Sequence, residues 1–444
     1  MTKYQPVIGI EVHVELNTKS KMFCRCSADY FGKEPNTHTC PVCLGLPGAL
    51  PYINEEAIRK CIQIGLALNC RISEKSLFER KNYFYPDLPK GYQISQYRWP
   101  LCVNGQLTLD NGQKIHINRV HQEEDTGKLT HIGGETLIDF NRSGVPLVEI
   151  VTEPDFKTSE EVRDYAKKLQ QIFRYLGVSN ADMERGDMRL EANVSVRKVK
   201  SKKEKVKTEL PNYRVELKNI NSFRFVVAAI EYEIKRQTEL LENGKTLTQE
   251  TRGWNEDKKY TFLQRSKEEA HDYRYFPEPD LPGIFFENKK IDELKNSLSE
   301  LPQIKIERFE KEYGINKTQA RLLMGTRGMA QYFEEAVRIG KSKEISGSQI
   351  ANYIINRKID PTASPEQIVD DIAQKTTGII SDETELEKVA SEVIEKNPRA
   401  VLDYKKGKEA ALQVLIGAVM KKTSGKADAQ KVKEIFISLL KSAL

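Results

Sequence analysis

The chain has 444 residues, of which 39% are hydrophobic and 30% are charged, a composition typical of a globular protein with two or three domains. Its apolar runs are far shorter than the roughly 18 residues of a membrane span. The first strand begins too near the amino terminus to leave room for a signal peptide. Seven cysteines, an odd number in a long chain, argue against a disulfide framework, so composition excludes membrane and disulfide-rich secreted proteins and predicts a cytoplasmic protein.

The net charge of +6 is concentrated at the carboxyl end. Residues 396–444 carry 11 Lys and Arg residues against four acids, a net of +7, so the rest of the chain is nearly neutral. A basic end on a neutral body suggests a polyanionic partner, with nucleic acid as the first candidate. An ordinary lysine-rich helical surface would give the same count, and both interpretations stay open. A second basic tract, residues 197–207, we interpret as a solvated hairpin loop.

The first strand, residues 7–16, reads VIGIEVHVEL and alternates apolar and polar residues, which is the period of a half-buried strand. Glu11, His13 and Glu15 therefore share one face, with neighbours about 6.6–6.8 Å apart. Such a row of charged groups is costly unless something neutralises it. A divalent cation would do so; the alternative is the exposed polar face of an edge strand.

Four cysteines form two close pairs, Cys24 with Cys26 and Cys40 with Cys43. Two thiol pairs, each on a turn-like sequence, are typical of a structural four-sulfur zinc site, which pins a loop that has no core of its own. The alternative is four unrelated buried cysteines. The remaining cysteines lack paired spacing and are interpreted as core residues: Cys61, Cys70 and Cys102.

The segment between this element and residue 128 mixes a helix, a loop and a hairpin. Residues 54–69 have helical periodicity. Residues 80–92, RKNYFYPDLPKGY, contain prolines that exclude a regular helix, and are either a rigid loop lining a pocket or an ordered connector. Residues 101–120 predict a hairpin with an Asp-Asn-Gly turn. Residues 121–128, HQEEDTGK, are a poor strand sequence and a candidate cation site.

The second half of the chain changes from mixed to helical. Residues 138–156 predict a turn and a strand, and residues 159–176 an amphipathic helix with Ser159 as its N-cap. Short strands are predicted over 188–196 and 213–219, followed by a helix over 223–243. From Ile291 onward the pattern is helical, with no strand signal.

Several long motifs occur in the order found in a known family: KNYFYPDLPKGYQISQY, HQEEDTGK, NRSGVPLVEIVTEPD, ELKNINSF and DYRYFPEPDLP. The chain resembles the B-subunit family of the aspartyl/glutamyl-tRNA amidotransferases, GatB, over essentially its whole length. The resemblance implies an α+β fold. Residues 1–291 would form an antiparallel-sheet cradle domain similar to glutamine synthetase, including the zinc element at 24–43. A helical domain at 292–378 and a basic helical, tRNA-binding tail at 379–444 would follow.

The resemblance also implies an activity and its partners. The family works in a heterotrimer with subunits A and C, in which the first of these partners releases ammonia from glutamine. The GatB chain binds misacylated Glu-tRNA(Gln) or Asp-tRNA(Asn), uses ATP and Mg2+ to phosphorylate the side-chain carboxylate, and lets ammonia displace the phosphate. No GxxxxGK[ST] stretch is present, so the ATP site is not a P-loop.

The family's functional positions are transferred here residue by residue. Its magnesium-binding positions correspond to Glu11, His13, Glu123, Glu191 and Glu216. A charged pair on its ammonia path corresponds to Lys81 and Glu124. From the chemistry of phosphoryl transfer we add two candidates for clamping phosphate oxygens, Arg142 and Arg189.

One departure and two alternatives remain. Between Ser364 and Asp382 the chain is shorter than the family pattern by roughly a few tens of residues, a deletion near 364–380 that puts tRNA grip in doubt more than catalysis. A non-catalytic tRNA-binding or assembly subunit would explain the basic tail but not three acids and a histidine converging on one face. A stand-alone ATP-dependent ligase would need its own ammonia source, and the chain has no glutaminase nucleophile pattern.

Overall fold

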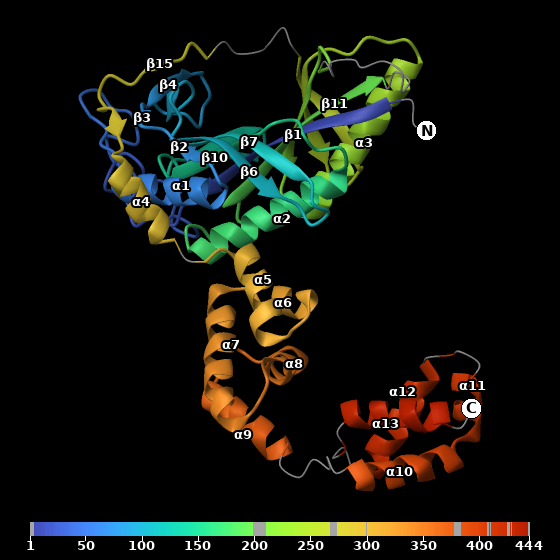
Figure 1. Ribbon diagram of the computed structural model, residues 1–444. Helices are drawn as coiled ribbons and strands as arrows, with labels where there is room; N and C mark the ends of the chain where they lie inside the picture. Colours follow the sequence, from blue (N-terminus) through green and yellow to red (C-terminus); the bar gives the residue numbers. More distant parts are fainter. Residues whose placement is uncertain are drawn as a thin grey trace. The chain divides into compact units, whose positions relative to one another are not determined.

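A computed structural model describes residues 4–198, 210–266, 273–298, 300–376, 383–405, 408, 410–423, 427 and 429–442 (Figure 1). The chain divides into two compact units, Met1–Lys305 and Ile306–Leu444. Most of the basic tract at 197–207 and part of the shortened segment near 364–380 lie outside the described residues. The predicted domain boundaries at 291 and 378 stay predictions.

The first unit is organised around one large sheet. Its strands are β1 (Tyr4–Glu15), β2 (Arg71–Ile72), β6 (Cys102–Thr108), β7 (Lys114–Glu124), β10 (Pro146–Thr152), β11 (Met188–Lys198), β12 (Val215–Ile220), β13 (Glu250–Asn255) and β14 (Tyr260–Ser266). Within the described residues, these nine strands run in the order β14-β13-β12-β11-β1-β10-β7-β6-β2. Neighbouring strands are antiparallel except β12 and β13, which are parallel.

The strand β1 lies in the middle of this sheet, hydrogen-bonded to β10 on one side and to β11 on the other. Ile10, Val12 and Val14 are at most 1% exposed, so the alternating pattern predicted the buried face correctly. The edge-strand alternative for Glu11 and His13 is wrong, because both neighbouring strands cover the backbone of β1 and the polar side chains lie over the centre of the sheet.

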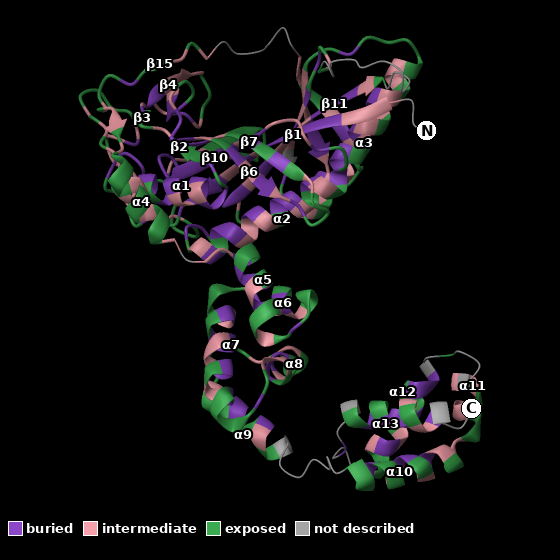
Figure 2. Ribbon diagram, in the orientation of Figure 1, coloured by how far each residue is buried: buried purple, intermediate pink, exposed green. Residues whose placement is uncertain are grey.

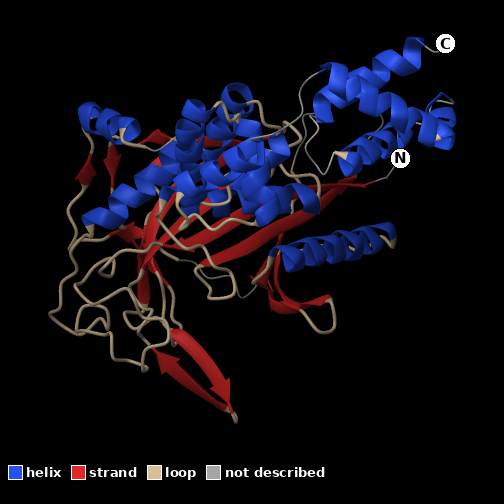
Figure 3. Ribbon diagram, turned by 90° about the horizontal axis from the view of Figure 1, so that it is seen from below, coloured by secondary structure: helices blue, strands red, loops and turns tan. Residues whose placement is uncertain are grey.

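Three helices cover the apolar face of the sheet: α1 (Glu55–Ala67), α2 (Ser159–Leu176) and α3 (Phe223–Glu242) (Figures 1 and 3). Their buried side chains face the buried strands, as the colouring of Figure 2 shows. The predicted N-cap of α2 is wrong by one residue. Thr158 caps the helix in a capping box with Glu161, while the Ser159 hydroxyl donates instead to Glu231 of α3 at 3.0 Å.

Shorter elements surround the large sheet. They are β3 (Lys75–Ser76), β4 (Glu79–Asn82), β5 (Tyr92–Ser95), β8 (Lys128–Ile132), β9 (Glu135–Asp139), β15 (Phe276–Pro277), β16 (Ile284–Phe285) and α4 (Asn288–Asn296). β4 pairs with both β5 and β15, so the proline-rich loop after residue 82 connects two paired strands and lies beside the second aromatic motif. This small sheet places residues near positions 81–95 against β7.

The second unit is helical, as predicted. From residue 302 onward the structure has α5 (Pro302–Tyr313), α6 (Lys317–Leu323), α7 (Arg327–Gly340), η2 (Lys341–Lys343), α8 (Gly347–Arg357), α9 (Pro365–Thr376), α10 (Glu383–Lys396), α11 (Pro398–Lys405), α12 (Ala410–Lys422) and α13 (Ala429–Ser442). Leu386, Leu415, Val419 and Phe436 form part of one buried core among the last helices. Each helix in the described ranges is too short or too polar to span a membrane. The α+β class is therefore confirmed.

Candidate metal centres

The register of the central strands gathers charged side chains that are far apart in the sequence. The Cα partners of His13 are Glu149 on β10 and Arg189 on β11, and Glu11 lies opposite Glu191. On the far side of β10, Glu149 lies opposite His121 of β7. Because side chains directly opposite each other share one face of a sheet, these pairings place the charges in adjoining rows.

The first candidate centre, which we name the His13 group, consists of His13, Glu123 and Glu149, whose ligand atoms lie within 4.8 Å of one another. The Oε2 atom of Glu149 is 3.9 Å from the His13 Nε2 and 3.1 Å from the His121 Nε2. Ser95 donates its hydroxyl to the Glu123 Oε1 at 2.6 Å. Glu123 and His121 are each 2% exposed, so the chain itself fixes this centre in a buried setting.

Opposite charges keep the carboxylates of the His13 group ionised. Burial alone would raise the pKa of Glu149, but His121 and His13 hold it well below its ordinary value. Burial likewise opposes ionisation of Glu123, whose pKa is nevertheless lowered, chiefly by Lys81. The pKa of His121 is raised because its two acidic neighbours outweigh the effect of burial. An ionised, preformed ligand set of nitrogen and oxygen donors suits a divalent cation.

The second centre, the Glu11 group, consists of Glu11, Glu191 and Glu216, again with ligand atoms within 4.8 Å of one another. The ammonium of Lys218 donates to the Glu191 Oε2 at 2.7 Å and lies 3.3 Å from the Glu216 Oε1. The amide of Asn193 donates to the Glu11 Oε1 at 2.9 Å. Three carboxylates with one ammonium leave an excess of negative charge, which hard cations such as Mg2+ neutralise.

The electrostatics of the Glu11 group agree with that excess. Burial, followed by repulsion from neighbouring carboxylates, raises the pKa of Glu11. Burial also disfavours ionisation of Glu191, but Lys218 and His13 lower its pKa to about 2. The buried Oδ1 of Asn193 has no hydrogen-bond partner among the described residues. Such an atom beside three carboxylates fits a hydrated cation, whose water would donate to it.

The structure brings all five predicted magnesium residues together, but in two groups rather than one, and it adds a ligand that the sequence analysis missed. Glu149 is the single charged residue in the strand sequence PLVEIVT. A lone carboxylate in an otherwise apolar, buried strand was the available signal. The expectation that residues 121–124 are a poor strand is wrong, because β7 continues to Glu124 with its acids facing partners on β5 and β10.

The two arginines proposed as phosphate clamps meet at Asp125. The Arg189 Nη2 lies 2.5 Å from the Asp125 Oδ2, and the Arg142 Nε lies 3.7 Å from its Oδ1. Arg142 also donates to the carbonyl oxygens of Thr126 and Gly127 at 2.9 and 2.8 Å. Despite burial, these guanidinium groups hold the pKa of Asp125 well below its ordinary value. The protein thus engages both arginines, and their role toward phosphate stays a prediction.

The predicted Lys81–Glu124 pair is replaced by another. The ammonium of Lys90 lies 2.5 Å from the Glu124 Oε1, and the backbone N–H of Ile94 donates to the same carboxylate at 2.9 Å. The Lys81 ammonium lies 5.1 Å from the ring centre of Tyr273. Although burial opposes its charge, Glu123 raises the pKa of Lys81 well above the ordinary value. Lys81 therefore belongs electrostatically to the His13 group.

The four paired cysteines converge, with sulfur atoms within 4.8 Å of one another. The Cys40 and Cys43 sulfurs are 3.9 Å apart, close to the roughly 3.8 Å of a tetrahedral site with Zn–S bonds of about 2.3 Å. Hydrogen bonding with Cys24 and the nearby Lys21 ammonium lower the pKa of Cys43 to about 5. The other three cysteines, Cys61, Cys70 and Cys102, are buried in the core, as predicted.

Comparisons with known proteins agree with this geometry. A family model described as the GatB/GatE catalytic domain matches residues 6–292, and one described as the GatB domain matches residues 316–440. The chain belongs to the GatB family. The B subunit of the aspartyl/glutamyl-tRNA(Asn/Gln) amidotransferase of Caldicellulosiruptor saccharolyticus is 45% identical over 479 residues, covering 98% of each chain. The protein of that name from Thermotoga maritima is 43% identical over 490 residues, covering 99% of each.

The lengths of these alignments bear on the predicted deletion. An alignment over 479 positions exceeds the 444 residues of this chain, so the relative contains residues that have no counterpart here. The expected shortness relative to the GatB family is therefore confirmed. Its placement near 364–380 stays a prediction.

Proposed function

We propose that the chain is the B subunit of a tRNA-dependent amidotransferase, which converts misacylated Glu-tRNA(Gln), Asp-tRNA(Asn) or both into Gln-tRNA(Gln) and Asn-tRNA(Asn). Near full-length identity of about 45% to proteins named for this activity supports the assignment. The observation that carries it on the structural side is the convergence of six acidic and imidazole ligands at the centre of the sheet, inside the segment that matches the catalytic-domain model.

The reaction needs activation because a carboxylate oxygen is a poor leaving group. An oxygen of the side-chain carboxylate attacks the γ-phosphorus of ATP, the bond from that phosphorus to the bridging oxygen breaks, and ADP leaves. Ammonia then attacks the acyl carbon, the carbon–oxygen bond to phosphate breaks, and the nitrogen loses a proton. Phosphoryl transfer depends mostly on positioning and charge neutralisation. The acyl phosphate must also be kept from water.

The chain's own groups supply both requirements in this proposal. The Glu11 and His13 groups would hold Mg2+, which when bound neutralises charge on the transferring phosphoryl group. Lys81 and His121 add fixed positive charge at the buried His13 group. Ser95 and Gln93 fix the Glu123 carboxylate at 2.6 and 3.1 Å, so its orientation requires no rearrangement.

The cysteine cluster would hold a structural Zn2+ ion. Its four sulfurs offer a complete tetrahedral set, which leaves no position open for substrate and separates this site from the chemistry. One sulfur already accepts a hydrogen bond from the buried Lys21 ammonium at 3.7 Å, so a thiolate is stabilised there.

Partners follow from the family and from charge. Subunits A and C would supply ammonia and complete a heterotrimer, because this chain lacks a glutaminase nucleophile pattern. The excess of lysine and arginine in residues 396–444 would contact tRNA phosphates. Lys90 and Glu124, at 2.5 Å, replace Lys81 and Glu124 as the charged pair proposed for the ammonia path.

The test uses the chain reconstituted with subunits A and C and supplied with free ammonium. ADP release from ATP should require Glu-tRNA(Gln) or Asp-tRNA(Asn), and correctly charged Glu-tRNA(Glu) is the matched control. Binding of tRNA without any tRNA-dependent ADP release would overturn the proposal and favour a non-catalytic tRNA-binding or assembly role.

A further inference from the structure

One oxygen of Glu216 is held by a residue outside both candidate centres. Glu216 on β12 and Thr251 on β13 are direct register partners in the sheet's one parallel pairing within the described residues. The Thr251 hydroxyl donates to the Glu216 Oε2 at 2.8 Å. A β-branched threonine has few side-chain rotamers, so this contact restricts the direction of the carboxylate.

The other oxygen of Glu216 faces positive charge. The Lys218 ammonium lies 3.3 Å from Oε1 and donates at 2.7 Å to Glu191, another member of the Glu11 group. The two oxygens therefore have separate environments: a neutral hydroxyl on Oε2 and a cation on Oε1. This division identifies Oε1 as the oxygen that attracts a positive charge, and Oε2 as the oxygen that the protein uses to aim it.

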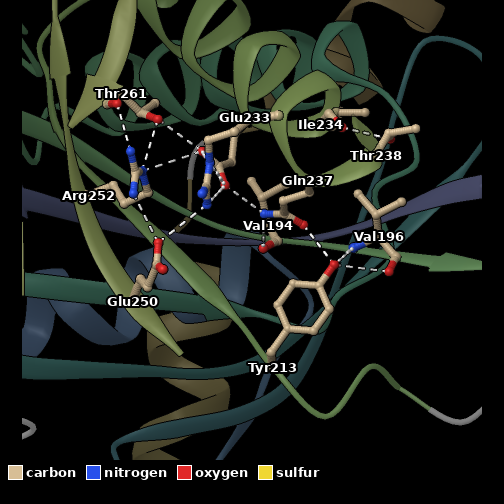
Figure 4. Close-up of polar contacts among 11 residues, drawn as sticks. Val194, Val196, Tyr213, Glu233, Ile234, Gln237, Thr238, Glu250, Arg252 and Thr261 are labelled. Carbon is tan, nitrogen blue, oxygen red and sulfur yellow. Dashed lines mark hydrogen bonds and ion pairs between the residues drawn. The ribbon is translucent and has the colours of Figure 1, made fainter. Parts of the chain in front are cut away.

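The strand that carries Thr251 is itself anchored on its opposite face. Arg252 lies 3.8 Å from Glu233 of α3, which is fully buried, and pairs with Glu250 at 3.0 Å. It also donates to the Thr261 carbonyl at 2.8 Å and to its hydroxyl at 3.0 Å (Figure 4). The pairing of β13 with β14 shifts register between Thr251 and Arg252. Such irregularities often re-aim a side chain beside a functional site.

We propose that Thr251 is a positioning residue that orients Glu216 for divalent-cation binding in the Glu11 group. This inference rests on the metal role of Glu216 in the proposed function. Residues that hydrogen-bond to a metal ligand fix its geometry, and losing them typically weakens metal affinity about 10–100-fold. A hydroxyl is sufficient for this role, so serine substitutes for threonine and valine, which has the same shape, does not.

The experiment titrates the purified full-length chain with Mn2+ as the probe and measures bound ion by electron paramagnetic resonance. Glu216→Gln serves as the reference, because the ion that it loses defines the Glu11 group. Thr251→Val should weaken that same ion about 10–100-fold, and Thr251→Ser should restore the wild-type affinity. Thr238→Val is the matched control: its hydroxyl bonds the Ile234 carbonyl at 2.7 Å, away from the ligands, and its loss should leave Mn2+ affinity unchanged.

The outcomes separate this inference from the function on which it rests. Wild-type Mn2+ affinity in Thr251→Val, with the ion lost in Glu216→Gln, overturns the positioning role and leaves the metal centre standing. No ion sensitive to Glu216→Gln in the wild-type chain overturns both. Melting temperatures report on folding; if the valine variant is unstable, Thr251→Ala removes the same hydroxyl and must show the same loss of affinity.

Discussion

The cysteine cluster and the two carboxylate groups are candidate metal centres built in opposite ways. Four thiols come from a stretch of 20 residues, 24–43, and meet through local turns. The acids and imidazole come from positions 11 to 216 and meet only because β1, β7, β10, β11 and β12 lie in one sheet in one register. A local cluster of this kind supports a loop, whereas the carboxylate groups depend on the whole sheet.

The two kinds of centre also differ in how their charge is balanced. The carboxylates have resident cations, His121 and Lys81 in one group and Lys218 in the other, so the chain folds around them before any metal binds. At the cysteine cluster the described contacts include a single ammonium, from Lys21. Removing a ligand should therefore affect chemistry at the carboxylate groups and local structure at the cysteines.

The largest expected effect is at the ligand that the sequence analysis missed. Glu149→Gln should lower tRNA-dependent ADP release on the order of 10³-fold or more, because one anionic ligand worth several kcal/mol in the transition state is lost. Binding of tRNA should be nearly normal, as measured by filter binding. Glu153→Gln, on a nearby carboxylate that accepts from Asn118 at 2.7 Å, is the control and should retain activity. Wild-type turnover in folded Glu149→Gln would remove the His13 group from the mechanism.

The next effect concerns stability. Asp125→Asn removes the buried anion that pairs with Arg189 and Arg142 and should cost about 2–3 kcal/mol at pH 7, measured from urea unfolding midpoints. Since the pKa of Asp125 is depressed in the folded protein, its contribution is complete above its unfolded pKa of about 3.9 and is lost as pH falls through the lower folded value. The gap to wild type should thus stay constant from pH 7 to pH 5 and narrow below about pH 4. A constant gap at all pH values would contradict the ion-pair explanation.

A smaller effect is expected at the cysteine cluster. Wild-type protein should contain about one zinc per chain, and Cys40→Ser should lose it. Proteolysis should then cut preferentially within residues 20–50, while turnover of the folded variant persists, because the cluster is closed to substrate. Cys61→Ser, in the core, is the control and should keep its zinc. Metal analysis that finds no zinc in reduced wild-type protein would end the zinc proposal.

The smallest effect is at the basic tail. Lys421→Gln combined with Lys433→Gln should lower the slope of log affinity for tRNA against log salt by about one unit for each phosphate that is no longer neutralised. Turnover at saturating tRNA should be unchanged. Lys422 is a less informative choice, because it already forms an ion pair with Glu392. An unchanged slope would indicate an ordinary lysine-rich helical surface.

Sequence alone determined every feature that depends on local periodicity or spacing. Alternation in β1 assigned Ile10 and Val12 to the core and Glu11 and His13 to the other face, and paired spacing identified the cysteine cluster. Long motifs identified the family. These inferences succeed because the period of a strand or a turn is fixed within a few residues, so neighbours in sequence report it directly.

Tertiary structure alone decided which side chains meet. Periodicity gives the face of a strand but not its partner strand or register, and a shift of one residue would turn every ligand away. For that reason the sequence analysis missed Glu149, Lys218 and Thr251, paired Glu124 with Lys81 rather than Lys90, and placed an edge strand among the alternatives for β1. In each case the deciding contact joins segments that are separated along the chain, which only the assembled sheet brings together.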